Sequence, residues 1–182
     1  NSMESLTNVT FEEIRVGDSA SVTRRVGTTE VEALALVGGD VDAFQIAEGG
    51  PVKPGEMQTE SVGAEALISG LLNRKLPGPG ASIVEQSLHF QGNVKPGDEL
   101  VATVTAREKR KEDKLVVFDC QVRSDGCELV TGTVTVRAPE QRLHYADVAA
   151  PQVILRRTDK YARIMKQCES LPPVVCGIAH PC

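Results

Sequence analysis

The side chains that could transfer protons lie in a loop at residues 39–55 and at the start of the apolar stretch that follows it. Asp40 comes directly after a helix-stopping Gly-Gly pair, where an Asp is either a functional carboxylate or an ordinary loop or capping group. Gln45 in the same loop is either a contact for a substrate or water or a solvated loop side chain, and its amide cannot gain or lose a proton near neutral pH. Glu60 could act as an acid or base, although acidic residues also favour helix amino ends because they complement the helix dipole.

Two further polar residues, Ser61 and Gln86, lie at the start of the predicted helix and on an apolar strand face. Ser61 could cap the predicted helix, or its backbone N–H could contact a substrate. Gln86 shares one face of a predicted strand with Val84, Leu88 and Phe90. An amide on an apolar face needs hydrogen-bond partners, which are either a ligand or a neighbouring backbone group.

The element that positions these residues is the stretch 60–72, which is apolar or small at nearly every position from Val62 onward. Only Glu65 and Ser69 interrupt it, and a helix that is apolar almost all round must be buried on most sides. At about 20 Å it is too short to span a membrane. Residues 81–137 follow as successive strands with one alternating apolar face. The predicted fold is therefore α+β, a buried helix wrapped by a curved antiparallel sheet.

Turn residues divide this sheet into elements. Strands are predicted at residues 19–26, 82–90, 100–109, 115–122 and 129–136. Ser124-Asp125-Gly126 is typical of a tight hairpin between the last two strands. Pro77-Gly78-Pro79-Gly80 breaks the helix before the first of the later strands.

Composition narrows the classes of partner. A net charge of −5, the absence of Trp and an aromatic content of 3% argue against nucleic acid as the main partner. The five cysteines are an odd number without CxxC spacing, which favours reduced thiols over a zinc site or a disulfide framework. We find neither a signal peptide nor a membrane-spanning run, and we expect a cytoplasmic protein that binds neither metal nor membrane.

The domain organisation is predicted from shifts in composition. Residues 1–9 are expected to be a tag remnant and leader, residues 10–138 the wrapped-helix domain, and residues 139–157 a linker. Residues 158–182 contain an amphipathic helix and the apolar run Val174–Ala179, which is typical of a buried parallel strand. A lone strand of that type has no partner strands of its own. We therefore interpret residues 158–182 as the beginning of a truncated α/β domain.

Several segments together resemble the MaoC-like, hotdog-fold (R)-specific enoyl-CoA hydratase family, over roughly residues 10 to 138. The segments are Val16–Asp18, Gly39–Gln45, Ala66–Ser69, Leu76–Gly80, Gln86–Phe90 and Pro96–Asp98. Pro77–Gly80 followed by Gln86–Leu88 looks most like the amino-terminal hydratase domain of two-domain enzymes. In those enzymes a phosphate acetyl- or butyryltransferase domain follows, and Leu171–Cys182 looks like its first strand.

The resemblance implies (R)-specific hydration of a trans-2-enoyl-CoA thioester, or the reverse dehydration, with no further cofactor. The family motif is roughly Gly-Asp-x-Asn-Pro-x-His, in which Asp and His act on one water molecule. Asp40 matches the Asp, Asp42 falls on the Asn, and Gln45 falls on the His. Catalysis is therefore expected to be impaired.

At the helix start the family commonly has Ala-His-Gly-Met. Glu60 falls on that His, Ser61 on the Gly and Val62 on the Met. The resemblance thus assigns catalysis to Asp40, Gln45 and Glu60. It assigns substrate binding to the six residues Asp42, Ser61, Val62, Gly78, Gly80 and Gln86, with Gly78 and Gly80 in a wall of the acyl-CoA channel unless their loop is only a helix breaker.

Three functions stay open from the sequence. The first is a hydro-lyase that acts on enoyl-CoA, and the second is an acyl-CoA thioesterase with Glu60 as base or nucleophile. The third is a non-catalytic module that binds acyl-CoA or dimerises to position a downstream acyltransferase, which the absence of the family's His favours. Since one such sheet leaves an edge strand exposed, a homodimer or a higher homo-oligomer is expected.

Overall fold

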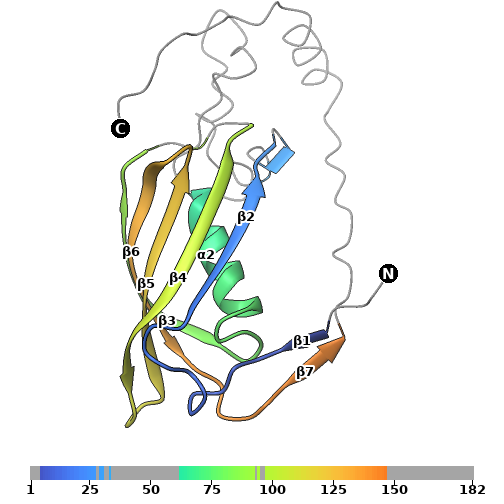
Figure 1. Cartoon of the computed structure of the whole chain (residues 1–182), viewed down its shortest axis with the longest axis vertical. Helices are drawn as coiled ribbons and strands as arrows, with labels where there is room; N and C mark the ends of the chain where they lie inside the picture. Colours follow the sequence, from blue (N-terminus) through green and yellow to red (C-terminus); the bar gives the residue numbers. More distant parts are fainter. Residues whose placement is uncertain are drawn as a thin grey trace, which may run out of the picture.

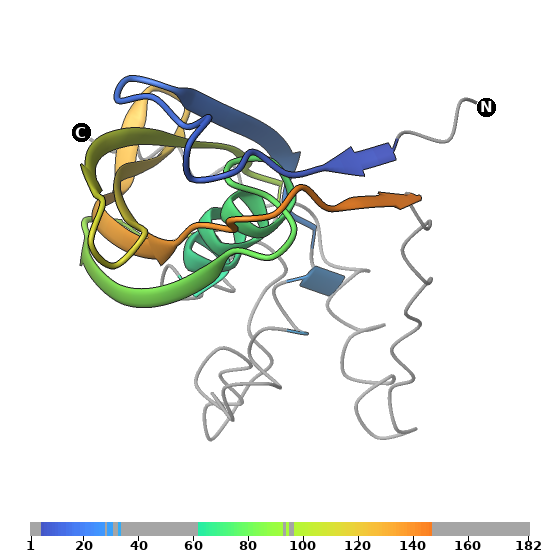
Figure 2. The same ribbon diagram turned by 90° about the horizontal axis from the view of Figure 1, so that it is seen from below.

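The computed structural model describes residues 5–27, 29–30, 33, 62–92, 94 and 97–146. In chain order, the elements are β1 (Ser5–Thr7), β2 (Ser19–Arg25), α2 (Val62–Arg74), β3 (Ser82–Phe90), β4 (Glu99–Arg110), β5 (Leu115–Ser124), β6 (Cys127–Arg137) and β7 (His144–Ala146). Five of the strands form an antiparallel sheet in the order β2-β4-β5-β6-β3. The sheet curls around α2, as seen from the side in Figure 1 and from below in Figure 2. The predicted helix wrapped by a curved antiparallel sheet is confirmed.

The core lies between α2 and the concave face of the sheet. The helix contributes Ala64, Ile68, Leu71 and Leu72, which recur at helical spacing and are at most 3% exposed. The sheet contributes alternate residues of its central strands, and these are Ala102, Val104, Ala106, Val116, Phe118, Cys120, Val122, Val130, Val134 and Val136. Burying each large apolar side chain contributes about 1.5–3 kcal/mol. These residues hold the helix in place.

The other face of α2 is less covered than its sequence predicts. Ala66 and Asn73 are exposed, and Ser69 and Gly70 are half-buried. Burial on most sides is therefore wrong for this single chain, because the sheet covers only the side of the helix that it faces. None of the helices in the described part of the chain is long and apolar enough to cross a membrane.

The strand predictions hold, with one local exception. The β5–β6 hairpin closes through Asp125 and Gly126, whose φ angles of 48° and 85° fit the predicted tight turn. In β3, however, a β-bulge lies between Ile83 and Glu85. The bulge displaces Val84, which is 53% exposed, and Ile83 packs against the core in its place.

Two short strands lie in segments that the sequence assigned to a leader and a linker. β1 and β7 pair antiparallel, with Leu6 opposite Tyr145. Together they form a two-stranded ribbon that extends away from the main sheet (Figure 2). The segments that enter and leave the wrapped-helix unit therefore run side by side.

Two glycines allow a matched test of the packing, because the same substitution should act in opposite directions. A Cβ on Gly132 of β6 would lie 2.0 Å from the backbone oxygen of Ser87 on β3. We expect Gly132→Ala to lower the free energy of unfolding by about 2–3 kcal/mol. A Cβ on Gly70 of α2 would meet nothing within 4 Å, so Gly70→Ala should raise it by up to about 1 kcal/mol. Urea denaturation measures both, and equal effects of the same sign would contradict this packing.

Candidate active site at the amino end of helix α2

Most of the residues predicted for catalysis belong to the loop before α2. Asp40, Asp42, Gln45, Glu60 and Ser61 lie outside the described residues. Their assignments as catalytic or substrate-binding residues therefore stay predictions. The described part of the site consists of the first turn of α2, the inner face of β3 and the loop after α2.

Helix α2 begins at Val62, where the sequence predicts contact with a substrate. The first backbone N–H groups of a helix have no partner within it, and the helix dipole makes this end partly positive. Such an end can hold an oxygen that gains negative charge during a reaction. The N–H groups of the first turn, which follows the loop of the predicted catalytic residues in the sequence, are therefore candidate oxyanion donors.

Gln86 finds its partner on the helix. Its amide nitrogen donates a hydrogen bond to the carboxylate of Glu65, in the first turn of α2. Gln86 lies opposite Val134 of β6, which is buried, so the amide is on the inner face as predicted. The amide thus has a partner on the helix, a side chain that the sequence analysis did not name, and its contact with a substrate stays a prediction.

Sequence reasoning missed Glu65 as a site residue. The available indication was that Glu65 interrupts an apolar helix and Gln86 interrupts an apolar strand face. Two such interruptions on elements that face one another can satisfy each other. In the structure Glu65 is half-buried and Gln86 is exposed, so the pair is accessible to solvent in the single chain.

The loop Pro77–Gly80 packs against the segments that follow β1 and precede β7. Gly78 and Gly80 have φ angles of 90° and 87°, which favour glycine. A Cβ on Gly78 would lie 3.3 Å from Cα of Asn8, and one on Gly80 would lie 2.9 Å from a methyl carbon of Leu143. Both glycines therefore have a structural role, and their place in a wall of an acyl-CoA channel stays a prediction.

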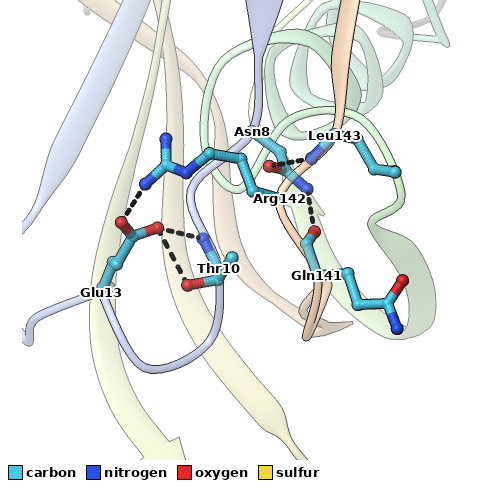
Figure 3. A network of polar contacts seen from close by, with 6 residues as sticks. All are labelled: Asn8, Thr10, Glu13, Gln141, Arg142 and Leu143. Atoms are coloured by element: carbon cyan, nitrogen blue, oxygen red, sulfur yellow. Dashed lines mark hydrogen bonds and ion pairs between the residues drawn. The ribbon is translucent and has the colours of Figure 1, made fainter.

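Asn8, which follows β1, ties this loop to the segment before β7, and Figure 3 shows its bonds to Gln141 and Leu143. Its side chain is 1% exposed and donates to the carbonyl oxygens of Pro79, at 3.1 Å, and Gln141, at 2.9 Å. Its amide oxygen accepts a hydrogen bond of 2.9 Å from the backbone N–H of Leu143. One buried amide thus joins three segments that are far apart in the sequence.

An ion pair extends this network at the surface (Figure 3). Glu13 accepts hydrogen bonds from the backbone N–H and hydroxyl of Thr10, at 3.0 and 2.9 Å, and pairs with Arg142. These hydrogen bonds, and then the charge of Arg142, hold the pKa of Glu13 below its ordinary value. Because both side chains are exposed, the pair adds little to stability.

The two cysteines within the described residues differ. Cys120 is a buried free thiol, and burial raises its pKa to about 12, so it is inert as expected. Cys127 is disulfide-bonded, which corrects the prediction of reduced thiols at this position. Among the residues that the structure describes, no three His, Cys, Asp or Glu side chains gather as a metal site requires.

No family model matches the chain, but individual relatives do. An (R)-specific enoyl-CoA hydratase of Rhodospirillum rubrum is 31% identical over 131 residues, which cover 71% of this chain and 91% of the relative. An (R)-specific enoyl-CoA hydratase of Aeromonas caviae is 30% identical over 135 residues, which cover 69% and 96%.

Solved structures agree with these relatives. The unliganded R-hydratase PhaJ1 from Pseudomonas aeruginosa superposes with a TM-score of 0.75 at 26% identity, covering 84% of this chain and 100% of the other. The (R)-hydratase from A. caviae involved in PHA biosynthesis gives a TM-score of 0.60 at 28% identity, covering 70% and 99%.

The role of Asn8 can be tested by removing its amide. We expect Asn8→Ala to lower the free energy of unfolding by about 2–3 kcal/mol, because the partners of the amide lose their hydrogen bonds in a buried place. Gln91→Ala is a matched control, since the exposed amide of Gln91 donates only one bond of 3.3 Å, to Thr131. It should change stability by less than about 0.5 kcal/mol in the same denaturation experiment. Equal losses of unfolding free energy in both variants would show that the hydrogen bonds of Asn8 do not stabilise the fold more than an exposed bond does.

Proposed function

Because this chain belongs to the family of (R)-specific enoyl-CoA hydratases, we propose that it adds water to trans-2-enoyl-CoA thioesters or removes water from (R)-3-hydroxyacyl-CoA. The chain has the hotdog fold of its hydratase neighbours, with one helix packed against an antiparallel sheet. A 3-hydroxybutyryl-CoA dehydratase of Methylorubrum extorquens is 25% identical over 133 residues, which supports the same reaction in reverse. The relatives thus support an enzyme of the hydro-lyase type.

The proposed mechanism divides the reaction among the loop and the helix. Asp40 accepts a proton from a water molecule that Gln45 orients, and the water oxygen bonds to C3 of the enoyl thioester. Charge then develops on the thioester oxygen, which the N–H groups at the start of α2 stabilise. A proton delivered to C2 completes the addition, and Glu60 is the candidate acid for this step. The observation that carries the proposal is that α2 begins at Val62, directly after the predicted catalytic loop.

One departure from the family favours a different function. Gln45 stands where the family motif has His, and an amide cannot transfer a proton. The alternative is therefore a non-catalytic acyl-CoA-binding or dimerisation module. Hydratase activity gained by Gln45→His would identify a decayed enzyme. A thioesterase that uses Glu60 is the remaining enzymatic alternative, and hydrolysis of acyl-CoA to free CoA would reveal it.

We also propose that the protein acts as a homodimer, paired through the edge that β3 forms among the described strands. This strand ends the sheet and exposes Val84 and Phe90, at 53% and 52%. Apart from Glu85, this edge carries no Lys, Arg, Asp or Glu, and its exposed apolar side chains favour pairing with a second strand. Dimerisation would also cover the half-exposed side of α2.

The two-domain organisation is proposed on the sequence alone. Residues 158–182 would begin a phosphate acyltransferase-like domain, supported by the apolar run Val174–Ala179. Both this assignment and the cytoplasmic location stay predictions.

The hydratase proposal is tested by the loss of enoyl absorbance when the full chain meets crotonyl-CoA. Wild-type protein should turn the substrate over, and Asp40→Asn should lower kcat/KM by about 100-fold or more, because the base is lost. Asp125→Asn is a matched control in the β5–β6 turn, where Asn tolerates the positive φ, and it should leave turnover unchanged. Absence of turnover in wild type would overturn the hydratase proposal and leave the binding module.

The dimer proposal is tested by sedimentation velocity. The wild-type species should have twice the mass of one chain. The double variant Val84→Lys, Phe90→Lys should have the mass of one chain, because lysines on an edge strand oppose pairing. Val16→Lys serves as a control, since Val16 is 62% exposed and lies before β2. A double variant that still sediments as a dimer would show that the subunits meet elsewhere.

A further inference from the structure

We propose that Glu65 is a positioning residue, which holds the amide of Gln86 against the oxygen at C3 of the substrate. That oxygen is the attacking water in hydration and the 3-hydroxyl group in dehydration. The inference rests on the proposed function, because it takes the amino end of α2 as the place of the thioester oxygen. It adds a residue that the hydratase resemblance does not assign.

The position of Glu65 carries the first step. It lies three residues after Val62, so its Cα is about 4.5 Å along the axis from the start of the helix. Side chains of a helix tilt toward its amino end, which brings the carboxylate of Glu65 back toward the unpaired N–H groups. The Glu65–Gln86 pair therefore stands beside the place where the thioester oxygen would bind.

The position of Gln86 carries the second step. Its neighbours on the inner face are apolar, and its cross-strand partner Val134 is fully buried. Gln86 itself is exposed in the single chain, and its bond to Glu65 uses only one of its N–H groups. The second N–H and the amide oxygen stay able to bond a substrate oxygen. A water or a hydroxyl group, which both donates and accepts, matches that remaining capacity.

The bond also links two elements that otherwise pack little against each other. Helix α2 packs chiefly on β4, with smaller contacts to β2, β5 and β6. Among the described strands, β3 is at an edge of the sheet, and Gln86 has β6 on one side. Because amide side chains in such a place are free to rotate, the carboxylate of Glu65 fixes the direction in which the amide points.

A purely structural role for Glu65 predicts a different result. An acidic residue in the first turn of a helix stabilises it by about 0.3–1 kcal/mol through the helix dipole. That effect would change stability and leave the reaction unchanged. The molecule supplies a matched pair for comparison, because Gln121 of β5 donates to Glu128 of β6 in the same way, away from α2.

The experiment compares steady-state hydration of crotonyl-CoA in the full chain with that in Glu65→Ala, Gln86→Leu and the double variant. We expect each single substitution to lower kcat by about tenfold or more with little change in KM, because the reacting oxygen is misplaced. The kcat of the double variant should be no lower than that of the less active single variant, since the two residues act as one unit. Glu65→Gln keeps an acceptor for the amide and should retain most of the activity, while Glu128→Ala should match wild type.

A second readout does not need turnover. In an Asp40→Asn background, titration calorimetry gives the dissociation constants of (R)-3-hydroxybutyryl-CoA and butyryl-CoA. The preference for the hydroxylated ligand should fall about tenfold in Glu65→Ala, as expected when one hydrogen bond to a substrate hydroxyl is lost. An unchanged preference would overturn the inference, as would equal losses in Glu128→Ala or losses that multiply in the double variant. Absence of turnover in wild type, with the preference still dependent on Glu65, would overturn the hydratase function and keep the positioning role.

Discussion

The packing of one apolar helix against a curled sheet is the constraint on which the rest of this structure depends. Ile68 and Leu72 lie fully buried beneath the central strands, and Ala64 lets the helix approach them closely. Because the helix is apolar nearly all round, the sheet must curl to cover it, and strands with alternate apolar residues are able to do so. A single sheet covers one side only. Within the described residues, the half-exposed side of α2 and the edge position of β3 thus have the same cause.

The two ends of α2 differ in their hydrogen bonds. The carboxyl end contributes to stability, and the amino end is the part proposed to take part in the reaction. At the carboxyl end, backbone carbonyls of Leu71 and Leu72 accept hydrogen bonds from Lys75, Leu76 and Gly78. The loop that follows is tied by Asn8 to both termini of the unit. At the amino end the first N–H groups have no partners within the helix. A helix anchored firmly at one end can offer the donors of its other end in a fixed place.

Elements with a repeating pattern could be predicted from the sequence, and features that arise from pairing could not. β3 begins and ends where predicted, because alternation over nine residues is a strong local pattern. The bulge at Val84 could not be foreseen, since it depends on the register with Thr135 of β6. β1 and β7 have three residues each, which is too short for any period to show. The bond between Gln86 and Glu65 joins residues 21 positions apart. In the sequence each of them is only a single polar residue in an apolar pattern.

The residues predicted for the site raise the question of which groups carry the protons that hydration moves. Hydration moves one proton off water and one onto C2, and the family motif assigns this work to Asp and His. With Gln45 in place of His, the residues predicted to carry protons are the carboxylates Asp40 and Glu60, and an amide can do no more than orient. Orientation then matters more than it does with two titrating partners, since water held in the wrong direction cannot be rescued by a second base. A polar pair such as Glu65 and Gln86, fixed beside the helix amino end, is the arrangement that this chemistry would require.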